Sequence, residues 1–165
     1  MWAQKYPSYH NGILALNSLL LLPDRPAQLA ALRVMAAHLD KGGRAVVDVW
    51  LPEPEDLVLY DGRLVLDWLR HDGATGEWVS KATSARYESA TQTARVTTIF
   101  DAWQNGGQVK RTVRDDLICF IGYHELLDLW ERAGFSPDTL AGDCEMTPFS
   151  PGTDRLVLFG TRVDG

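Results

Sequence analysis

The sequence predicts an α/β fold that is interrupted by an antiparallel four-stranded sheet. Two observations lead to this prediction. An apolar run, a helix-spaced apolar stripe and a second apolar run follow one another between Ile13 and Leu51, and such a strand–helix–strand unit carries parallel strands. Four β-rich segments separated by turn residues come next, before helical spacing returns. They predict an antiparallel insertion within the α/β unit.

The first strand is expected over residues 13–16, an apolar run closed by polar residues. The following helix is expected to begin near Pro26, whose missing N–H suits a first helical turn. We expect it to end at Gly42-Gly43, because glycine commonly follows a helix C-terminus. Its apolar stripe consists of Leu29, Leu32, Ala36 and Leu39. A β-branched run then predicts a second, parallel strand over residues 45–51.

The middle of the chain is rich in Val, Thr, Trp, Tyr and Phe, which favour strands. Asn105-Gly106-Gly107 is the strongest hairpin signal in this region. We expect an antiparallel lid over residues 57–120, inserted into a single domain whose other parts are residues 1–56 and 121–165. The four expected strands of the lid cover residues 63–70, 77–89, 94–103 and 108–120.

The last part of the chain returns to helical spacing. A helix is expected over residues 123–133 and is terminated by Gly134. A weak strand over residues 136–140 and a final apolar strand over residues 155–161 complete the α/β part.

Composition limits the classes of partner. Sixteen Lys and Arg stand against 22 Asp and Glu, and the net charge of −6 argues against nucleic acid as the main partner. No apolar stretch approaches the ~20 residues of a membrane span, so no membrane partner is expected. Cys119 and Cys144 lack the spacing of a zinc site or a disulfide framework. We expect no metal and a cytoplasmic location.

Three segments in a fixed order carry a family resemblance. Residues 17–20 (Asn-Ser-Leu-Leu) follow an apolar strand, residues 39–48 combine a helix end, a Gly-Gly turn and a strand, and residues 125–135 form a helix ending in Ala-Gly-Phe. Together they resemble the C-terminal half of class I S-adenosylmethionine-dependent methyltransferases of the small-molecule type with a β lid. The resemblance implies a truncated Rossmann-like sheet, partly parallel, with an antiparallel last strand and the lid as an insertion.

The resemblance also exposes an absence. The family binds S-adenosylmethionine on a glycine-rich turn after its first strand, where backbone N–H groups can approach the ligand. No G-x-G occurs in this sequence, and only residues 1–12 precede the first expected strand. The resemblance thus implies a substrate-binding half that transfers a methyl group to O or N of a small molecule when a cofactor half completes it. The alternative is a non-catalytic ligand-binding or assembly module derived from a methyltransferase.

The resemblance assigns candidate cofactor and catalytic residues. Leu16, Asn17 and Leu20 correspond to positions beside the methionine part of S-adenosylmethionine, although ordinary turn chemistry also explains a polar strand end. Tyr123 and His124 open the last long helix, and a histidine there could take a proton from the methyl acceptor. A purely structural role for both residues is the alternative, because proximity and orientation alone drive many methyl transfers.

Substrate-binding candidates lie mostly in the lid, where aromatic walls with a few polar groups suit small ligands. Packing of these aromatics into one face of the sheet is the alternative. The candidates are Tyr87, Trp103, Arg111 and Asp143.

The apolar strand at residues 13–17 is the expected contact with a partner chain. In the family the corresponding strand is central, so here it becomes an unpaired edge and a template for pairing. We therefore expect a homodimer or a complementary chain at this edge.

Overall fold

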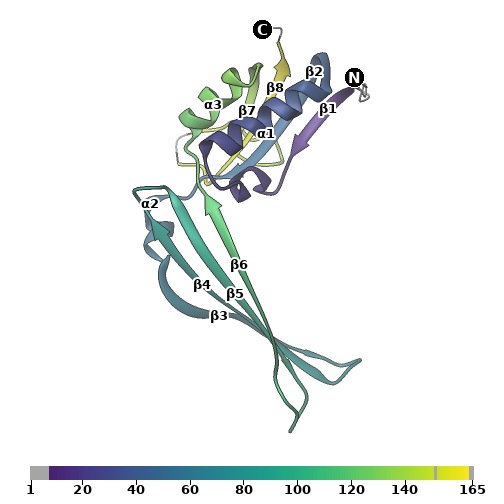
Figure 1. The fold of residues 1–165 in the computed structure, drawn as a ribbon, viewed down its shortest axis with the longest axis vertical. Helices are drawn as coiled ribbons and strands as arrows, with labels where there is room; N and C mark the ends of the chain where they lie inside the picture. The colour runs from purple at the N-terminus through teal and green to yellow at the C-terminus, as the bar shows by residue number, and fades with distance from the viewer. Residues whose placement is uncertain (1–7, 151, 164–165) are drawn as a thin grey trace, which may run out of the picture. The chain divides into compact units, whose positions relative to one another are not determined.

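The computed structural model describes residues 8–150 and 152–163. The chain divides into two compact units (Figure 1). The first, here called the α/β unit, contains the residues up to Glu53 and those from Cys119 onwards. The second, the lid unit, is Pro54–Ile118.

The α/β unit is built on a four-stranded sheet in the order β1-β2-β8-β7. Strand β1 runs parallel to β2, so the expected parallel unit is confirmed. Strand β8 is antiparallel to both of its neighbours. The strands are β1 (Tyr9–Leu14), β2 (Leu39–Trp50), β7 (Phe135–Ala141) and β8 (Arg155–Arg162).

Helices cover one face of this sheet. Helix α1 (Arg25–His38) and helix α3 (Tyr123–Arg132) lie side by side over it (Figure 1), and a short 3-10 turn, η1 (Ser18–Leu21), precedes α1. Asp24 caps α1 by accepting a hydrogen bond from the backbone N–H of Ala27 at 2.8 Å. Large apolar side chains fill the space between helices and sheet, among them Leu32, Leu39, Val47, Leu126, Trp130, Phe135 and Leu158.

Two regions of the α/β unit differ from the sequence prediction. Gly42-Gly43 do not end α1, which stops at His38; instead they lie inside β2, where the pairing with β1 is irregular. Gly42 has a φ of 71°, and a Cβ on Gly43 would lie 2.8 Å from the carbonyl oxygen of Asp40. The glycine pair thus forms a bulge, which needs the same conformational freedom as a helix end.

The first strand also lies earlier in the chain than predicted, over Tyr9–Leu14 instead of residues 13–16. It stops at Leu14, because Leu16 and Asn17 take φ values of 54° and 63°, outside the extended region. The predicted edge at residues 13–17 is therefore the strand Tyr9–Leu14 followed by a turn.

The lid unit is an antiparallel meander in the order β3-β4-β5-β6, as predicted. A short helix, α2 (Pro54–Val58), precedes it. The hairpin turn at Gly106 is present: the N–H of Gly107 donates to the carbonyl of Gln104 at 2.9 Å, and Gly106 has a φ of 74°. The strands are β3 (Asp61–Asp72), β4 (Glu77–Glu88), β5 (Thr93–Trp103) and β6 (Lys110–Cys119).

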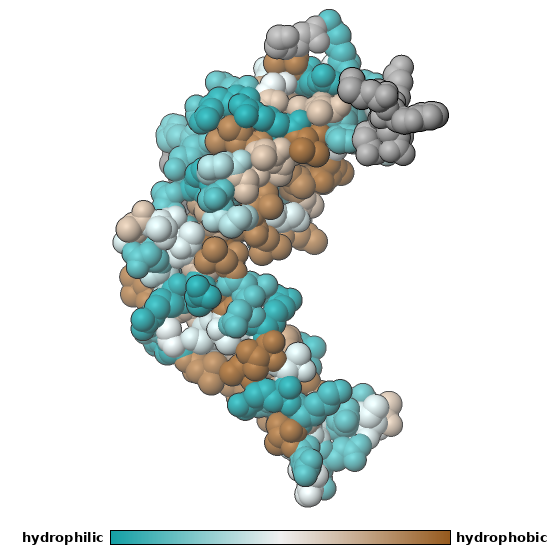
Figure 2. Space-filling model, in the orientation of Figure 1, coloured by the Kyte–Doolittle hydropathy of each residue, from teal (hydrophilic) through white to brown (hydrophobic). Residues whose placement is uncertain are grey.

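The lid unit has almost no buried core. Only Ala94 and Thr98 are buried among its residues. Large apolar side chains of β3 remain exposed, including Leu64, Leu66 and Leu69, and Figure 2 shows hydrophobic and hydrophilic patches alternating along this unit. None of the helices within residues 8–150 and 152–163 has the length and apolar character needed to cross a bilayer.

Candidate functional site

The carboxyl ends of the parallel strands β1 and β2 form the first candidate site. In open α/β sheets, ligands bind at this edge. Here the chain leaves β1 through two consecutive non-glycine residues with positive φ, Leu16 and Asn17. Such a conformation persists only where its surroundings enforce it, and it is typical of ligand-binding turns.

Hydrogen bonds to the end of β2 enforce this turn. The N–H of Leu16 donates to Oδ2 of Asp48 at 3.1 Å, and the N–H of Asn17 donates to the Asp48 carbonyl at 3.2 Å. In return, the N–H of Trp50 donates to Oδ1 of Asn17 at 2.6 Å. The turn after β1 is thereby fixed to the last residues of β2.

Asp48 is the centre of this arrangement. Asp48 is only 5% exposed. Its second carboxylate oxygen, Oδ1, accepts a hydrogen bond from the Arg155 guanidinium on β8. A buried carboxylate needs such partners, because burial without them costs several kcal/mol. Three strands therefore cooperate to hold one exposed turn.

The three predicted cofactor contacts occupy different environments. Leu16 is 81% exposed at the edge, and Asn17 lies beside it with its side chain oriented by Trp50. The Nδ2 group of Asn17 makes no hydrogen bond to any other described residue. Leu20 is 1% exposed and belongs to the core. The structure thus brings Leu16 and Asn17 to the edge and places Leu20 behind it.

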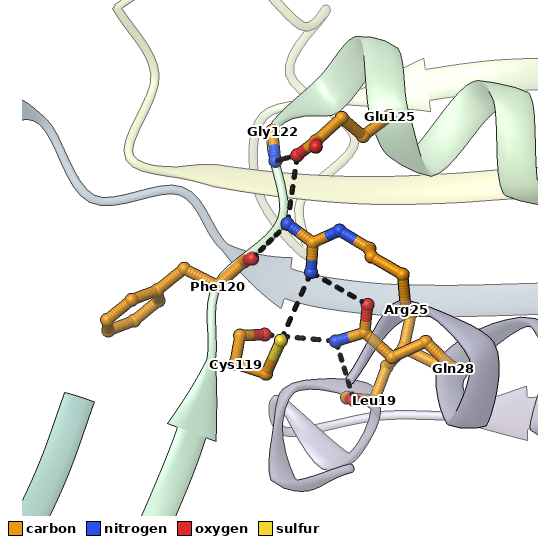
Figure 3. Close-up of polar contacts among 7 residues, drawn as sticks. All are labelled: Leu19, Arg25, Gln28, Cys119, Phe120, Gly122 and Glu125. Atoms are coloured by element: carbon orange, nitrogen blue, oxygen red, sulfur yellow. Dashed lines mark hydrogen bonds and ion pairs between the residues drawn. The ribbon is translucent and has the colours of Figure 1, made fainter. Parts of the chain in front are cut away.

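A second polar cluster surrounds Arg25 at the start of α1 (Figure 3). Its Nη2 donates to the carbonyl of Phe120 at 2.5 Å and to Oε2 of Glu125 at 3.0 Å. Its Nη1 donates to Oε1 of Gln28 at 3.0 Å and lies 3.3 Å from Sγ of Cys119. One guanidinium therefore joins α1, the segment after β6 and α3.

Gln28 extends the cluster into the core. This side chain is fully buried, and its Nε2 donates to the carbonyls of Leu19 and Cys119 at 3.2 and 3.0 Å (Figure 3). The Leu19 carbonyl also accepts a hydrogen bond from the N–H of Leu22 at 3.3 Å, so Gln28 adds a second partner to that group. Gln28 thereby fixes η1 against the segment that enters α3.

The Arg25 cluster also sets the first turn of α3, where the predicted catalytic residues lie. Oε2 of Glu125 accepts a hydrogen bond from the Gly122 N–H at 3.0 Å, which caps the helix. The ring of Tyr123 lies 3.7 Å from that of His124 and 5.3 Å from that of Phe149, measured between centroids. Tyr123 is half-buried and His124 exposed, and neither side chain forms a hydrogen bond with another described residue.

The predicted substrate residues come from both units. Tyr87, Trp103 and Arg111 belong to the lid unit, whereas Asp143 belongs to the α/β unit. Trp103 lies opposite Trp78 in the β4–β5 register. The N–H of Tyr87 donates to the Tyr60 carbonyl at 2.9 Å.

Both charged residues of this set, Arg111 and Asp143, form hydrogen bonds with groups close to them in the fold. Arg111 binds both oxygens of Asp101, at 2.8 and 2.7 Å, and this contact holds the pKa of the Asp101 carboxyl below its usual value. Asp143 accepts hydrogen bonds from the N–H groups of Thr147 and Glu145, and those with Thr147 contribute most to lowering its pKa. Asp143 therefore shapes its own loop.

The residues that hold both sites together were not predicted from the sequence. A single acid within the apolar run of β2 was the available signal for Asp48, because a carboxylate at a buried position needs a partner. A Gly122-x-x-Glu125 spacing before an apolar helix was the signal for Glu125. Arg25 and Gln28 carried no signal for this role, since the groups they bind at Cys119, Phe120 and Glu125 lie about 90–100 residues away in sequence. Among residues 8–150 and 152–163, no group of His, Cys, Asp and Glu could hold a metal ion.

Comparisons with known proteins define the class of fold. No family model and no curated protein matches the sequence. Among solved structures, the chain is similar to the CcbJ methyltransferase from Streptomyces caelestis, with a TM-score of 0.74 and 15% identity over 99% of this chain and 61% of that one. It is also similar to the sugar N-methyltransferase KedS8 from Streptoalloteichus sp ATCC 53650, with a TM-score of 0.72 and 19% identity over 98% and 59% of the two chains.

A third similar structure is DesVI from Streptomyces venezuelae, with a TM-score of 0.68 and 22% identity over 97% of this chain and 61% of that one. This chain therefore has the fold of S-adenosylmethionine-dependent methyltransferases, in partial form. It spans about 60% of the length of the structures it matches.

Proposed function

We propose that this chain is the C-terminal, substrate-binding part of an S-adenosylmethionine-dependent methyltransferase. In this proposal it transfers a methyl group to O or N of a small molecule when a cofactor-binding part completes it. The observation that carries the proposal is the strained turn at Leu16 and Asn17, held at the carboxyl edge of two parallel strands by Asp48. Two of the structures with this fold are described as a sugar N-methyltransferase and an amino pentose methyltransferase, which supports a small-molecule acceptor.

The residues at the edge fit one end of S-adenosylmethionine. The Nδ2 of Asn17 is a hydrogen-bond donor available to a carboxylate or hydroxyl, and the exposed Leu16 side chain offers apolar contact. Leu20 does not fit this role, because its side chain is buried. The cofactor itself supplies the activated methyl group, while these residues bind and orient.

Tyr123 and His124 are proposed to handle the proton of the acceptor. Loss of this proton makes the acceptor O or N nucleophilic, and histidine accepts protons near neutral pH. The Arg25–Glu125 cluster fixes the helix turn that carries both residues. Tyr87 is proposed as the aromatic contribution of the lid unit to acceptor binding. Trp103 does not share that site, because it lies opposite Trp78, nine positions along β4 from Tyr87 and on the other face of the sheet.

The free edge of β1 is proposed as the contact with the completing part. Among the described residues, β1 pairs only with β2, and Ile13 is 67% exposed. An added strand would satisfy the open backbone groups of Tyr9–Leu14 and cover this side chain. In the absence of a completing part, a second copy of this chain is proposed to take its place.

The alternative is a non-catalytic binding or assembly module. It is favoured by one specific observation, the absence of any G-x-G in the 165 residues. The two functions place different demands on Asn17, since only the methyltransferase needs its Nδ2 as a donor. Both Cys119 and Cys144 are free, and for either function we propose a reducing cytosol as the location.

Calorimetric titration with S-adenosylmethionine tests the proposal. The chain alone is expected to bind weakly, and addition of a polypeptide that carries a glycine-rich cofactor segment is expected to create tight binding. Asn17→Asp keeps the oxygen that accepts from Trp50 but removes the Nδ2 donor, so it should weaken binding by the complemented chain about tenfold. Ser18→Ala is the matched control on the same turn. Absence of binding in every combination would favour the non-catalytic module.

A further inference from the structure

A polar pocket of about 390 Å³ lies on one face of the lid unit. Its polar side chains come from β4 and β5, and include Ser84, Arg86, Glu88, Thr93, Arg95 and Thr97. No function proposed above uses this pocket. Its lining carries two positive charges and one negative charge, in a chain whose net charge is −6.

Arg86 and Arg95 lie directly opposite each other in the β4–β5 register. Like charges at directly opposed positions destabilise a sheet. Neither guanidinium forms an ion pair or hydrogen bond with another described residue. The repulsion between these two arginines therefore lowers the stability of the sheet, and no contact among the described residues of the lid unit offsets it.

The other arginines of the lid unit all have partners. Arg63 pairs with Asp61 at 2.8 Å, Arg111 with Asp101 at 2.7 Å and Arg114 with Asp116 at 2.6 Å, while the Arg70 guanidinium lies 4.7 Å from the centroid of the Trp68 ring. The opposed pair is thus an exception in a surface where arginine is otherwise neutralised or stacked.

The backbone of β3 is shaped to leave room for Arg86. The β3–β4 pairing shifts register between Asp61 and Leu64, which places a bulge opposite this arginine. Within the bulge, Gly62 has a φ of 91°, and a Cβ there would lie 3.1 Å from Nε of Arg86. Bulges recur where a strand must redirect a side chain. Ser84 holds the bulge in place by donating a hydrogen bond to the Gly62 carbonyl at 2.8 Å.

We propose that Arg86 and Arg95 bind the phosphate group of a phosphorylated small molecule. Two guanidinium groups can each donate paired hydrogen bonds to a phosphate. A dianion bound between them attracts both groups, and this attraction offsets the repulsion of one arginine by the other. Glu88 repels any anion at the same pocket, but the two arginines leave the lining with a net positive charge, so a doubly charged phosphate is attracted more strongly than a singly charged carboxylate. The proposal goes beyond methyl transfer and holds for either function proposed above.

Titration of the full chain with inorganic phosphate tests this site, with sodium chloride keeping the ionic strength constant. We expect a saturable shift of the Nε–Hε signals of Arg86 and Arg95 in NMR spectra. Arg86→Gln and Arg95→Gln should each weaken phosphate binding about tenfold or more. Arg114→Gln is the matched control, because it removes the same charge from an ion pair that lies outside the pocket. Equal weakening in all three variants, or no saturable shift, would overturn the proposal.

Two further measurements separate binding from a structural role. Pyrophosphate should bind at least as tightly as phosphate, whereas acetate should bind far more weakly. Equal binding of acetate would contradict a phosphate site.

Without phosphate, the Arg95→Gln variant should unfold at a midpoint no lower than that of the parent chain, because the substitution relieves the repulsion between the two arginines. A clearly lower midpoint would show that the arginine stabilises the sheet instead. These phosphate titrations test Arg86 and Arg95 only. The S-adenosylmethionine titration tests Asn17, so either proposal can fail without the other.

Discussion

The α/β unit and the lid unit are stabilised in different ways. In the α/β unit, side chains as large as Trp130 and Phe135 are almost fully buried between helices and sheet. In the lid unit, only Ala94 and Thr98 are buried, although its four strands are long and well paired. Burial of apolar area therefore stabilises the first unit, whereas strand pairing, turns and ion pairs stabilise the second. Substitution of a glycine should therefore change the free energy of unfolding by different amounts, and for different reasons, in the two units.

The largest effect is expected from Gly160→Ala in β8 of the α/β unit. A Cβ there would lie 2.3 Å from the carbonyl oxygen of Ser136 and 2.5 Å from Nε1 of Trp130. Neither the strand backbone nor a fully buried indole can move freely, so the free energy of unfolding should fall by about 3 kcal/mol or more. Denaturant titration followed by the amide signals of β2 and β8 measures the loss.

Gly73→Ala is the control for this substitution. Gly73 lies in a turn of the lid unit, and a Cβ there would meet nothing within 4 Å. It should leave the unfolding of both units almost unchanged. A loss for Gly160→Ala no larger than that of the control would mean that the packing of Trp130 against β8 is looser than the structure indicates.

A smaller effect is expected from Gly106→Val in the turn between β5 and β6. No atom lies within 4 Å of a Cβ at this position, so the cost is conformational: a β-branched residue resists the φ of 74°. The lid unit should lose about 1–3 kcal/mol, and the α/β unit should not change. Gly73→Val is the matched control, because Gly73 has equal space but no positive φ. Equal midpoints for the two variants would contradict this account of the turn.

The contrast between the units also explains what the sequence could predict. The meander was predictable because its signals are local: alternating β-branched and aromatic residues, and glycine turns such as Asn105-Gly106-Gly107. The βαβ unit was predictable from periodicity. Gly42-Gly43 were wrongly predicted to end a helix, because a bulge and a helix end need the same conformational freedom of glycine and local sequence does not distinguish them.

The candidate sites were predicted only in part for a related reason. Asn17 was placed at the sheet edge by the strand-then-polar pattern, but its positive φ depends on Asp48, which lies far away in sequence. Likewise, the Arg25 cluster joins the start of α1 to groups on Phe120 and Glu125, about 90–100 positions away. A lone acid in an apolar run indicates that a partner is needed, but only the folded chain shows which distant group that partner is.

Acid should weaken the lid unit through its ion pairs. Oδ2 of Asp67 lies 2.8 Å from Nζ of Lys81 and accepts a hydrogen bond from Thr83, and the contact with Lys81 contributes most to lowering the pKa of Asp67. The pKa of this carboxyl is lower in the folded chain than in the unfolded chain, where it is ~3.9. Its ion pair therefore stabilises the fold fully above the unfolded pKa, and this contribution is lost as pH falls through the folded pKa. Denaturant titrations from about pH 6 to about pH 3, followed by lid amides, should show this decline.

Asp67→Asn should flatten the decline, because its side chain no longer titrates. Asp128→Asn is the control: it removes the exposed ion pair with Arg132 on α3, in the α/β unit. The lid profile of that variant should match the parent chain. An unchanged slope for Asp67→Asn would assign the acid sensitivity to other carboxylates of the lid, such as Asp101 beside Arg111.

The smallest effect on stability, and the sharpest on assembly, is expected from Ile13→Lys at the edge of β1. Ile13 lies opposite Val46, which in turn lies opposite Phe159, so the three share one face of the sheet. That face is opposite α3, because the next residue along β8, Gly160, is the one that approaches Trp130. Ile13 is 67% exposed, so its replacement removes little burial and should change the free energy of unfolding by no more than about 0.5 kcal/mol.

A lysine at this edge should nevertheless prevent another strand from pairing, since edge charges are a common way to block strand addition. Light scattering should therefore show the parent chain as a dimer, or as a complex with its completing part, and Ile13→Lys as a monomer. Val34→Lys is the control: Val34 is also an exposed apolar residue but lies on α1, so its variant should assemble like the parent chain. If the parent chain stays monomeric at every concentration and binds no completing part, the proposed pairing at this edge is wrong, and the α/β unit is stable with one strand edge unpaired.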